Sequence, residues 1–223
     1  MISVENLSFT YKNKINKSSV HVLEDINVNF EPGIFYTIFG PSGSGKTTLL
    51  GLLGGLEEPD AGRITLSGID IKEIGYYVLR RNMVSYVFQN YYLFPYMTSV
   101  ENVLMAMNEK TFSYKENAKR ASEILESLGI TVDEMSRKVK RLSGGQQQRV
   151  AIARCLASGA EYILADEPTG NLDNKTAVTI IELFTDLVKN YNKCVVAVTH
   201  SDLVKSYSDI SYKLNDKKLE RII

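Results

Sequence analysis

The stretch Gly40–Thr48, GPSGSGKTT, decides how this chain folds. It fits the pattern G-x-x-x-x-G-K-[ST], in which glycines let backbone N–H groups turn inward around phosphate oxygens. The apolar run 34–40, IFYTIFG, precedes it and TTLLGLLGGL follows it, so we expect a buried strand, a phosphate loop and a helix. This context argues against a chance glycine turn. The residues expected to hold nucleotide phosphates are Gly40, Pro41, Ser42, Gly43, Ser44, Gly45, Lys46, Thr47 and Thr48.

The whole chain of 223 residues suits one sizeable domain, and its 26 Lys and Arg balance its 26 Asp and Glu. This balance argues against a nucleic-acid partner, which usually selects a basic excess. We find no apolar run of the ~20 residues that cross a bilayer and no secretory signal at MISVENLSFTY, and therefore expect a cytoplasmic protein. Cys155 and Cys194 are isolated, and the chain has only two histidines. This excludes a Cys/His zinc site and gives no hint of a disulfide scaffold, so we expect two buried or half-buried free thiols.

Alternating and short apolar runs predict strands, and apolar residues at helical spacing predict helices. The predicted strands are 2–10, 20–30, 34–40, a hairpin over 62–71, 84–89, 161–166, 194–200 and ISYKLND near the end. Helices are expected after the phosphate loop and over KTAVTIIELFTDLVKNY. Within 97–158 they are expected over ENVLMAMNE, over YKENAKRASEILESLG with Gly129 as its C-cap, and after Gly145. The fold class is therefore α/β, with a mainly parallel core sheet flanked by helices, an N-terminal antiparallel β subdomain and an α-helical subdomain.

Two carboxylates follow the predicted strand YILAD, because Asp166 ends it and Glu167 comes next. An Asp-Glu pair in this position is usually a turn or a helix cap. Beside a phosphate loop we instead expect Asp166 to hold Mg²⁺ and Glu167 to act as the general base on a water in line with the γ-phosphate.

A second glycine pair lies in RLSGGQQQRVAIAR, residues 141–154. Two glycines before an amphipathic helix are typical of an anion site at a helix N-terminus. The phosphate loop already supplies a better one, so the sequence raises the question of which phosphate this second pair serves.

Five features follow one another along the chain: GPSGSGKTT, Gln89 after VSYVF, LSGGQ, LADEPTGNLD and a His200 that ends a strand. This is the order found in ATP-binding cassette (ABC) ATPases, which the chain resembles over nearly its whole length. The surrounding segments are similar to the subfamily of macrolide efflux, lipoprotein release and antimicrobial-peptide resistance. The resemblance implies one ABC domain over 1–223, with lobe I at 1–89 and 159–223 and a helical lobe II at 90–158. It also implies ATP and Mg²⁺ as ligands.

The resemblance assigns roles to residues that would otherwise be ordinary strand, surface or turn residues. Tyr11 matches the aromatic that stacks on adenine, and Gln89 the glutamine that senses Mg²⁺ and the γ-phosphate. The implied sets are Lys46, Gln89, Glu167 and His200 for catalysis, with His200 in contact with the γ-phosphate, and Thr47, Gln89 and Asp166 for the metal. The implied nucleotide-binding residues also include the signature loop, which faces the nucleotide of a second copy, and an aspartate that communicates between the two sites: Ser143, Gly144, Gly145 and Gln146, and Asp173.

The implied partners are a second copy of the chain, joined head-to-tail across ATP, and an integral membrane permease that docks near residues 89–105. The aromatic cluster 91–96 is either part of that docking surface or core packing, and the basic residues of 137–141 are either a solvated face or a partner contact. Residues 108–121 and 130–140 are expected to carry partner-specific surface. The alternatives are a cell-division ATPase that signals through a membrane partner, an ABC ATPase acting on nucleic acid or the ribosome, and a degenerate scaffold. The sequence does not specify the transported substrate.

Overall fold

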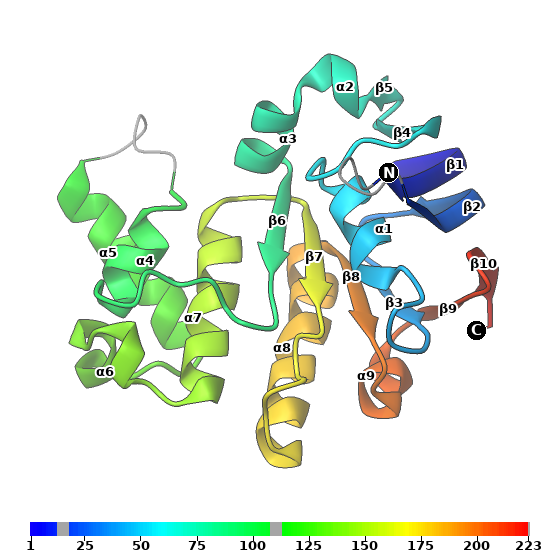
Figure 1. Ribbon diagram of the computed structural model, residues 1–223. Helices are drawn as coiled ribbons and strands as arrows, with labels where there is room; N and C mark the ends of the chain where they lie inside the picture. Colours follow the sequence, from blue (N-terminus) through cyan, green and yellow to red (C-terminus); the bar gives the residue numbers. More distant parts are fainter. Residues whose placement is uncertain (13–17, 108–112, 223) are drawn as a thin grey trace.

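The computed structural model describes residues 1–12, 18–107 and 113–222, which form two sheets with helices around them (Figure 1). The larger sheet has the strand order β10-β9-β3-β8-β7-β6. Its strands are β3 (Phe35–Phe39), β6 (Val84–Val87), β7 (Tyr162–Asp166), β8 (Cys194–Thr199), β9 (Ile210–Asn215) and β10 (Lys218–Arg221). All neighbouring pairs are parallel except β9 and β10. The parallel centre confirms the predicted core sheet.

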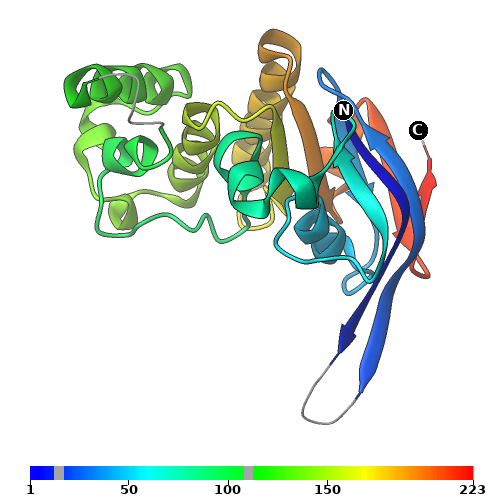
Figure 2. The same cartoon turned by 90° about the horizontal axis from the view of Figure 1, so that it is seen from above.

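The smaller sheet is antiparallel and has the order β2-β1-β4-β5. It consists of β1 (Ile2–Lys12), β2 (Ser19–Phe30), β4 (Ala61–Leu66) and β5 (Ile69–Asp70). Figure 2 shows that the β1–β2 hairpin extends well beyond the rest of the molecule. This sheet confirms the predicted antiparallel subdomain; residues 13–17, within the loop KNKINKSS, lie outside the described part of the chain.

The larger sheet is buried on both faces because its central strands are apolar at most positions. Val196 and Val198 of β8 pack with α1 (Lys46–Leu53) and the smaller sheet. Val195 and Ala197 point the other way, toward α7 (Gly144–Ala157) and α8 (Asn174–Tyr191). A continuous apolar run is the pattern expected of a parallel strand covered by helices on both sides.

The helical region contains α4 (Ser99–Leu104), α5 (Tyr114–Ser127), α6 (Val132–Ser136), the 3₁₀ turn Val139–Arg141 and α7. Each of its four α-helices starts at a Ser or Thr whose hydroxyl accepts from a backbone N–H, while a Glu or Gln three residues on accepts from the N-cap N–H. Such capping boxes fix the start of a helix. Gly129, expected to end a helix, follows α5 with a φ of 74°.

The short elements α2 (Ile71–Ile74), α3 (Tyr76–Asn82), α6, α9 (Asp202–Tyr207) and β10 were not predicted, because four to seven residues hold too little periodicity to identify. The helix expected after Gly145 already includes both glycines, because it begins at Gly144. Cys155 and Cys194 are free and buried, as expected. In the part of the chain that is described, no helix combines the length and the apolar character needed to cross a membrane.

Candidate functional site

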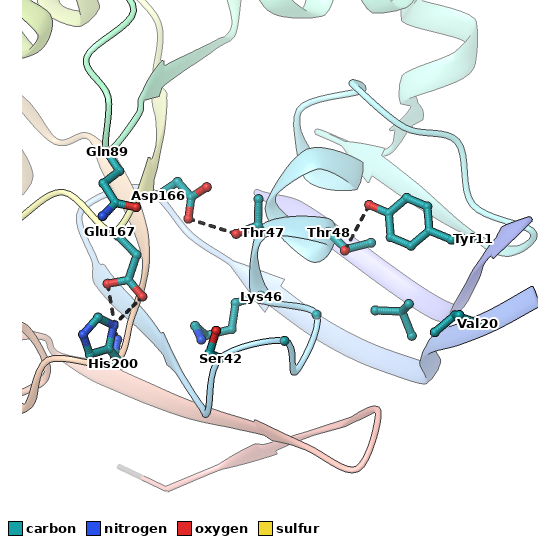
Figure 3. Close-up of a pocket in the computed structure, with 13 residues that line it drawn as sticks. Tyr11, Val20, Ser42, Lys46, Thr47, Thr48, Gln89, Asp166, Glu167 and His200 are labelled. Carbon is teal, nitrogen blue, oxygen red and sulfur yellow. Dashed lines mark hydrogen bonds and ion pairs between the residues drawn. The ribbon is translucent and has the colours of Figure 1, made fainter. Parts of the chain in front are cut away.

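A pocket of about 760 Å³ opens between the phosphate loop, the β1–β2 hairpin and the carboxyl ends of the core strands (Figure 3). Its volume lies within the ~300–1,000 Å³ that is usual for small-molecule sites. Predicted residues that line it are Tyr11, Ser42, Gly43, Gly45, Lys46, Thr47, Thr48, Gln89, Asp166, Glu167 and His200. The fold therefore brings most of the predicted set to one place.

The phosphate loop presents backbone N–H groups because its glycines adopt a conformation that other residues avoid. Gly43 and Gly45 have φ angles of 78° and 103°, in the left-handed region. A Cβ on Gly45 would lie 2.7 Å from Val22 Cγ1, so the loop also needs a glycine for space. Among the described side chains, none caps the N-terminus of α1. Its free N–H groups and the helix dipole favour an anion in the pocket.

Lys46 is buried and adds the positive charge of this site. Its Nζ donates to the carbonyl oxygens of Gly40 and Pro41 at 2.8 and 2.9 Å. An ammonium group has three protons, so one donor remains for a phosphate oxygen. Within the described residues no carboxylate forms an ion pair with Lys46.

Thr47 and Asp166 place two oxygen ligands side by side, with Thr47 Oγ1 donating to Asp166 Oδ1 at 3.1 Å. Burial raises the pKa of the Asp166 carboxyl and the charge of Glu167 also raises it, while the hydrogen bond from Thr47 lowers it. A partly desolvated carboxylate beside a hydroxyl suits a hard cation such as Mg²⁺. The donor set therefore fits the expected metal.

Glu167 is held in a strained backbone conformation, with a φ of 43°. Such a conformation costs about 1–3 kcal/mol in a residue other than glycine, and it persists only where neighbouring groups enforce it. Here Glu167 N donates to Val198 O at 2.9 Å. Its carboxylate accepts from Thr199 Oγ1 at 3.1 Å and contacts His200 Nδ1 at 2.8 Å. These contacts fix the carboxylate at the wall of the pocket, directed toward His200 (Figure 3).

Gln89 lies at the same end of the pocket, two residues after β6. Asn171 Nδ2 donates to the Gln89 backbone carbonyl at 3.1 Å, and Gln89 Nε2 donates to Asn171 Oδ1 at 3.5 Å. The pair joins the segment after β6 to the segment after β7.

Tyr11 and Val20 lie at the opposite end of the pocket from Glu167 and His200 (Figure 3). The two residues face each other across the hairpin. Tyr11 is 45% exposed, packs edge-on against Phe9 and has its hydroxyl 3.2 Å from Thr48 Oγ1. This end offers an aromatic ring with aliphatic neighbours, Val20 and Val22, and so fits a planar base.

Other predicted residues lie outside this pocket. Pro41 and Ser44 line a smaller adjoining pocket of about 350 Å³, where the buried Ser44 Oγ has no hydrogen-bond partner in the described structure. Gly40 is a packing position, because a Cβ there would lie 2.4 Å from Leu214 O.

The signature loop and Asp173 line neither pocket in the described structure. Ser143 caps α7 and Asp173 caps α8. The two helix starts lie side by side, since a Cβ on Gly145 would come within 2.5 Å of Thr176 Cγ2. Hydrogen bonds from Thr176 lower the pKa of Asp173. Within one chain, therefore, the second glycine pair lies apart from the phosphate loop.

Sequence reasoning missed Val20, Val22, Asn171 and Thr199. The only sequence pattern that indicates the two valines is strand alternation. The only one that indicates Thr199 is its place before His200 at the end of a strand.

Comparison with known proteins decides the family. A family model described as ABC transporter matches residues 23–170. The chain is 43% identical to the ABC transporter ATP-binding protein YclH of Bacillus subtilis, over 96% of this chain and 93% of that protein. The chain belongs to the ABC transporter ATP-binding family. It is an ABC ATPase, as its sequence motifs indicated.

Two further members of the family are similar to this chain over nearly its whole length. The lipoprotein-releasing system ATP-binding protein LolD 1 of Rhodopirellula baltica is 38% identical over 99% of this chain and 96% of that protein. The dimeric structure of the cassette MJ0796, from Methanocaldococcus jannaschii, matches with a TM-score of 0.89 and 38% identity, covering 99% of this chain and 97% of that one. A post-hydrolysis dimer of MJ0796 bound to ADP and Pi matches with a TM-score of 0.88 and 37% identity, over the same shares of the two chains.

Proposed function

We propose that this ABC ATPase works as a head-to-tail homodimer which closes on ATP and thereby drives or gates a separate membrane permease. The observation that carries the proposal is the single pocket that gathers Lys46, the Thr47–Asp166 pair and the Glu167–His200 pair, while the signature loop stays outside it.

Different residues of the pocket have different roles in ATP hydrolysis. Lys46 and the free N–H groups of α1 hold the phosphate oxygens. Thr47, Asp166 and Gln89 would hold Mg²⁺, which when bound neutralises charge on the phosphates. Glu167 takes a proton from the attacking water, whose oxygen bonds to the γ-phosphorus as the bond to the bridging oxygen breaks. Thr199 and His200 fix its carboxylate, so the base needs little rearrangement.

The resemblance to ABC ATPases assigns His200 to the γ-phosphate and Tyr11 to adenine, and their places at the two ends of the pocket support this assignment. Aromatic and aliphatic side chains at one end and charged groups at the other suit a ligand with a base and a phosphate chain.

A second copy of the chain would complete the site. Ser143 is exposed and its loop lines neither the ATP pocket nor the smaller pocket beside it, so it is free to meet the nucleotide of another copy. Asp173 lies beside it at the start of α8 and would meet the same partner. The dimeric structures of the relative MJ0796 support this arrangement.

The permease would dock near residues 89–105 and hold the ATPase at the cytoplasmic face of the membrane. Tyr92, Phe94 and Tyr96 are 64, 47 and 71% exposed, which favours the interface reading of this cluster over core packing. Lys140 lies 4.5 Å above the Tyr96 ring, so the basic residues adjoin the same surface. Relatives named for lipoprotein release support export of a lipoprotein, peptide or antibiotic, or resistance to one.

The proposal is tested by purifying a tagged chain from detergent-solubilised membranes of its source organism. We expect an integral membrane protein to co-purify in a fixed ratio, and ATP hydrolysis by the complex to require Mg²⁺ and to stop with EDTA. A chain that purifies without a membrane protein, or that sediments with ribosomes or DNA, would contradict it. The membrane topology of the partner separates export from a cell-division role.

A further inference from the structure

Glu134, a residue of α6, contacts the signature loop from outside the ATP pocket. Its Oε1 accepts from Gln146 Nε2 at 2.5 Å, and this contact is partly buried. Its Oε2 accepts from Thr131 N at 2.8 Å, which completes the capping box at the start of α6. One carboxylate therefore joins the start of α6 to the start of α7, which lies beside it (Figure 1).

The capping box of α7 differs in its chemistry from the other three boxes of the helical region. At α4, α5 and α6 the residue three positions after the N-cap is a glutamate, whereas at α7 it is Gln146. An ionised glutamate only accepts hydrogen bonds, but a glutamine side chain also donates them. Gln146 Oε1 accepts from Ser143 N at 2.7 Å, so the amide NH2 needs an acceptor elsewhere, and Glu134 supplies it.

A glutamine in the signature loop keeps a negative charge away from the phosphates. A carboxylate at position 146 would repel an anion at the start of α7. The Gln146 amide separates the Glu134 carboxylate from Ser143, because it bonds to one of them at each end. A hydrogen bond from Thr131 N lowers the pKa of the Glu134 carboxyl, burial opposes this, and the charge of Arg137 lowers it further. Glu134 is therefore ionised at neutral pH.

The charge of Glu134 also determines the orientation of the Gln146 amide. In the opposite orientation the amide oxygen would face the carboxylate and the NH2 would face the N–H of Ser143, so that both hydrogen bonds would be lost. In the observed orientation Ser143 Oγ accepts from Gln146 N at 3.3 Å. A hydroxyl has one proton as well as its acceptor lone pairs, so the Ser143 hydroxyl keeps a proton to donate to a phosphate.

The helical region holds Glu134 itself in place. Its backbone carbonyl accepts at 3.0 Å from the hydroxyl of Ser99, a fully buried residue of α4. The next residue, Met135, is buried in the apolar cluster that also contains Val139 and Val150. The carboxylate therefore extends from an anchored backbone position to the signature loop, as a supporting residue must if it is to fix another side chain.

We propose that Glu134 is a positioning residue for the signature loop: it holds the Gln146 amide, and through it Ser143, in the arrangement that meets the nucleotide of a second copy. The inference rests on the proposed function, because a head-to-tail dimer is what brings a nucleotide to this loop. Glu134 lines neither the ATP pocket nor the smaller pocket beside it. Its effect therefore belongs to the site completed by its own signature loop, and not to the site that contains its own phosphate loop.

Mixed dimers separate these two sites. A Lys46→Ala subunit, in large excess over a subunit with an intact phosphate loop, leaves one working site in each mixed dimer. That site combines the intact phosphate loop with the signature loop of the Lys46→Ala subunit. Glu134→Ala on the Lys46→Ala subunit should lower phosphate release about tenfold, because a hydrogen bond to a charged group is lost at the working site. Glu134→Ala on the other subunit should leave the rate nearly unchanged.

Further variants on the Lys46→Ala subunit exclude a general effect on the helices. Glu116→Ala removes the corresponding glutamate from the capping box of α5 and, as the matched control, should leave the rate nearly unchanged. Each variant is first required to keep the wild-type thermal unfolding midpoint. If Glu134→Ala lowers the midpoint, Glu134→Gln takes its place in both arms. A glutamine has one acceptor oxygen where the carboxylate has two, so it cannot accept from both Thr131 and Gln146, and the rate should fall severalfold.

Three outcomes would overturn the positioning role of Glu134: an equal loss in both arms, a loss only on the subunit with the intact phosphate loop, or no loss in either arm. Ser143→Arg on the Lys46→Ala subunit tests the dimer itself and should abolish hydrolysis. If that mixture stayed active, the two copies would share no site, and the proposed function would fail independently of Glu134.

Discussion

The starts of α1 and α7 are both glycine-containing helix N-termini, yet they differ in every feature that binds an anion. At α1 the glycines have positive φ angles and the N–H groups are uncapped by the described side chains. At α7 the hydroxyl of Ser143 accepts from Gln146 N at 3.3 Å, and Gln146 Oε1 accepts from Ser143 N at 2.7 Å. The N–H groups at the start of α1 are open to a ligand, whereas the N–H groups of Ser143 and Gln146 at the start of α7 already have hydrogen-bond partners within the chain.

The glycines at α7 serve close packing. Gly144 and Gly145 are absent from the described residues with positive φ, and their missing side chains leave room for Tyr91 and Thr176. A glycine pair before a helix is therefore not sufficient for an anion site; the site also needs free donors and a positive side chain such as Lys46. The signature loop contributes to a nucleotide only if another copy of the chain brings one to it.

The largest expected effect is at the α1 end, where the chemistry takes place. Glu167→Gln should lower the rate of ATP hydrolysis by about 10²–10⁴-fold, because the amide cannot accept the proton of the water. ATP binding should remain, since Glu167 holds no phosphate. Phosphate release measures the rate of hydrolysis, and titration with a fluorescent ATP analogue measures ATP binding. A fully active variant would remove Glu167 from the role of base.

At the α7 end, Ser143→Arg should abolish most hydrolysis while the dilute single chain keeps its ATP affinity. The arginine places a long cationic side chain where the second copy must approach. Ser143→Ala is the matched control: it loses the cap, worth about 1 kcal/mol, without adding bulk, and should keep more activity. Loss of ATP affinity in the dilute Ser143→Arg chain would mean that the signature loop serves its own phosphate.

The link between the two ends is Gln148, a fully buried residue of α7 whose Nε2 donates to Pro168 O at 2.7 Å. Pro168 follows Glu167, so this bond ties the signature helix to the carboxylate that we propose as the general base. Gln148→Leu should cost about 1–3 kcal/mol of stability, because the carbonyl stays buried without a donor. It should also lower kcat several-fold with little change in KM for ATP.

Thermal unfolding and steady-state kinetics measure these effects, with Gln147→Leu as the neighbouring control. If KM rose with kcat unchanged, Gln148 would have no part in positioning Glu167.

The smallest effect is expected at Tyr11. Tyr11→Ala should weaken ATP binding about 2- to 10-fold, as expected for the loss of one aromatic contact. Tyr11→Phe keeps the ring and loses only the hydroxyl contact with Thr48, so its affinity should stay close to that of the wild type. Calorimetric titration of both variants with ATP measures the two affinities. Unchanged affinity in Tyr11→Ala would place adenine elsewhere.

The sequence allowed the phosphate loop, the core strands and the two carboxylates to be predicted, because each depends on residues close together in the chain. Contacts between distant segments could not be predicted. The pairing of Tyr11 with Val20 follows three register shifts between β1 and β2, and no local pattern encodes such shifts. The bonds of Thr199 to Glu167 and of Gln148 to Pro168 span 32 and 20 residues. The lobe boundary at 89/90 and 158/159 stays a prediction, and residues 108–112 of the expected partner surface lie outside the described chain.

The most direct test of a site shared between two chains is to mix two inactive variants, Lys46→Ala and Ser143→Arg. In a mixed dimer one site carries both defects, but the other combines an intact phosphate loop with an intact signature loop. Equimolar mixing should therefore restore hydrolysis to about a quarter of the wild-type rate, because half of the dimers are mixed and each has one intact site. A mixture no more active than the sum of its two components would contradict the account.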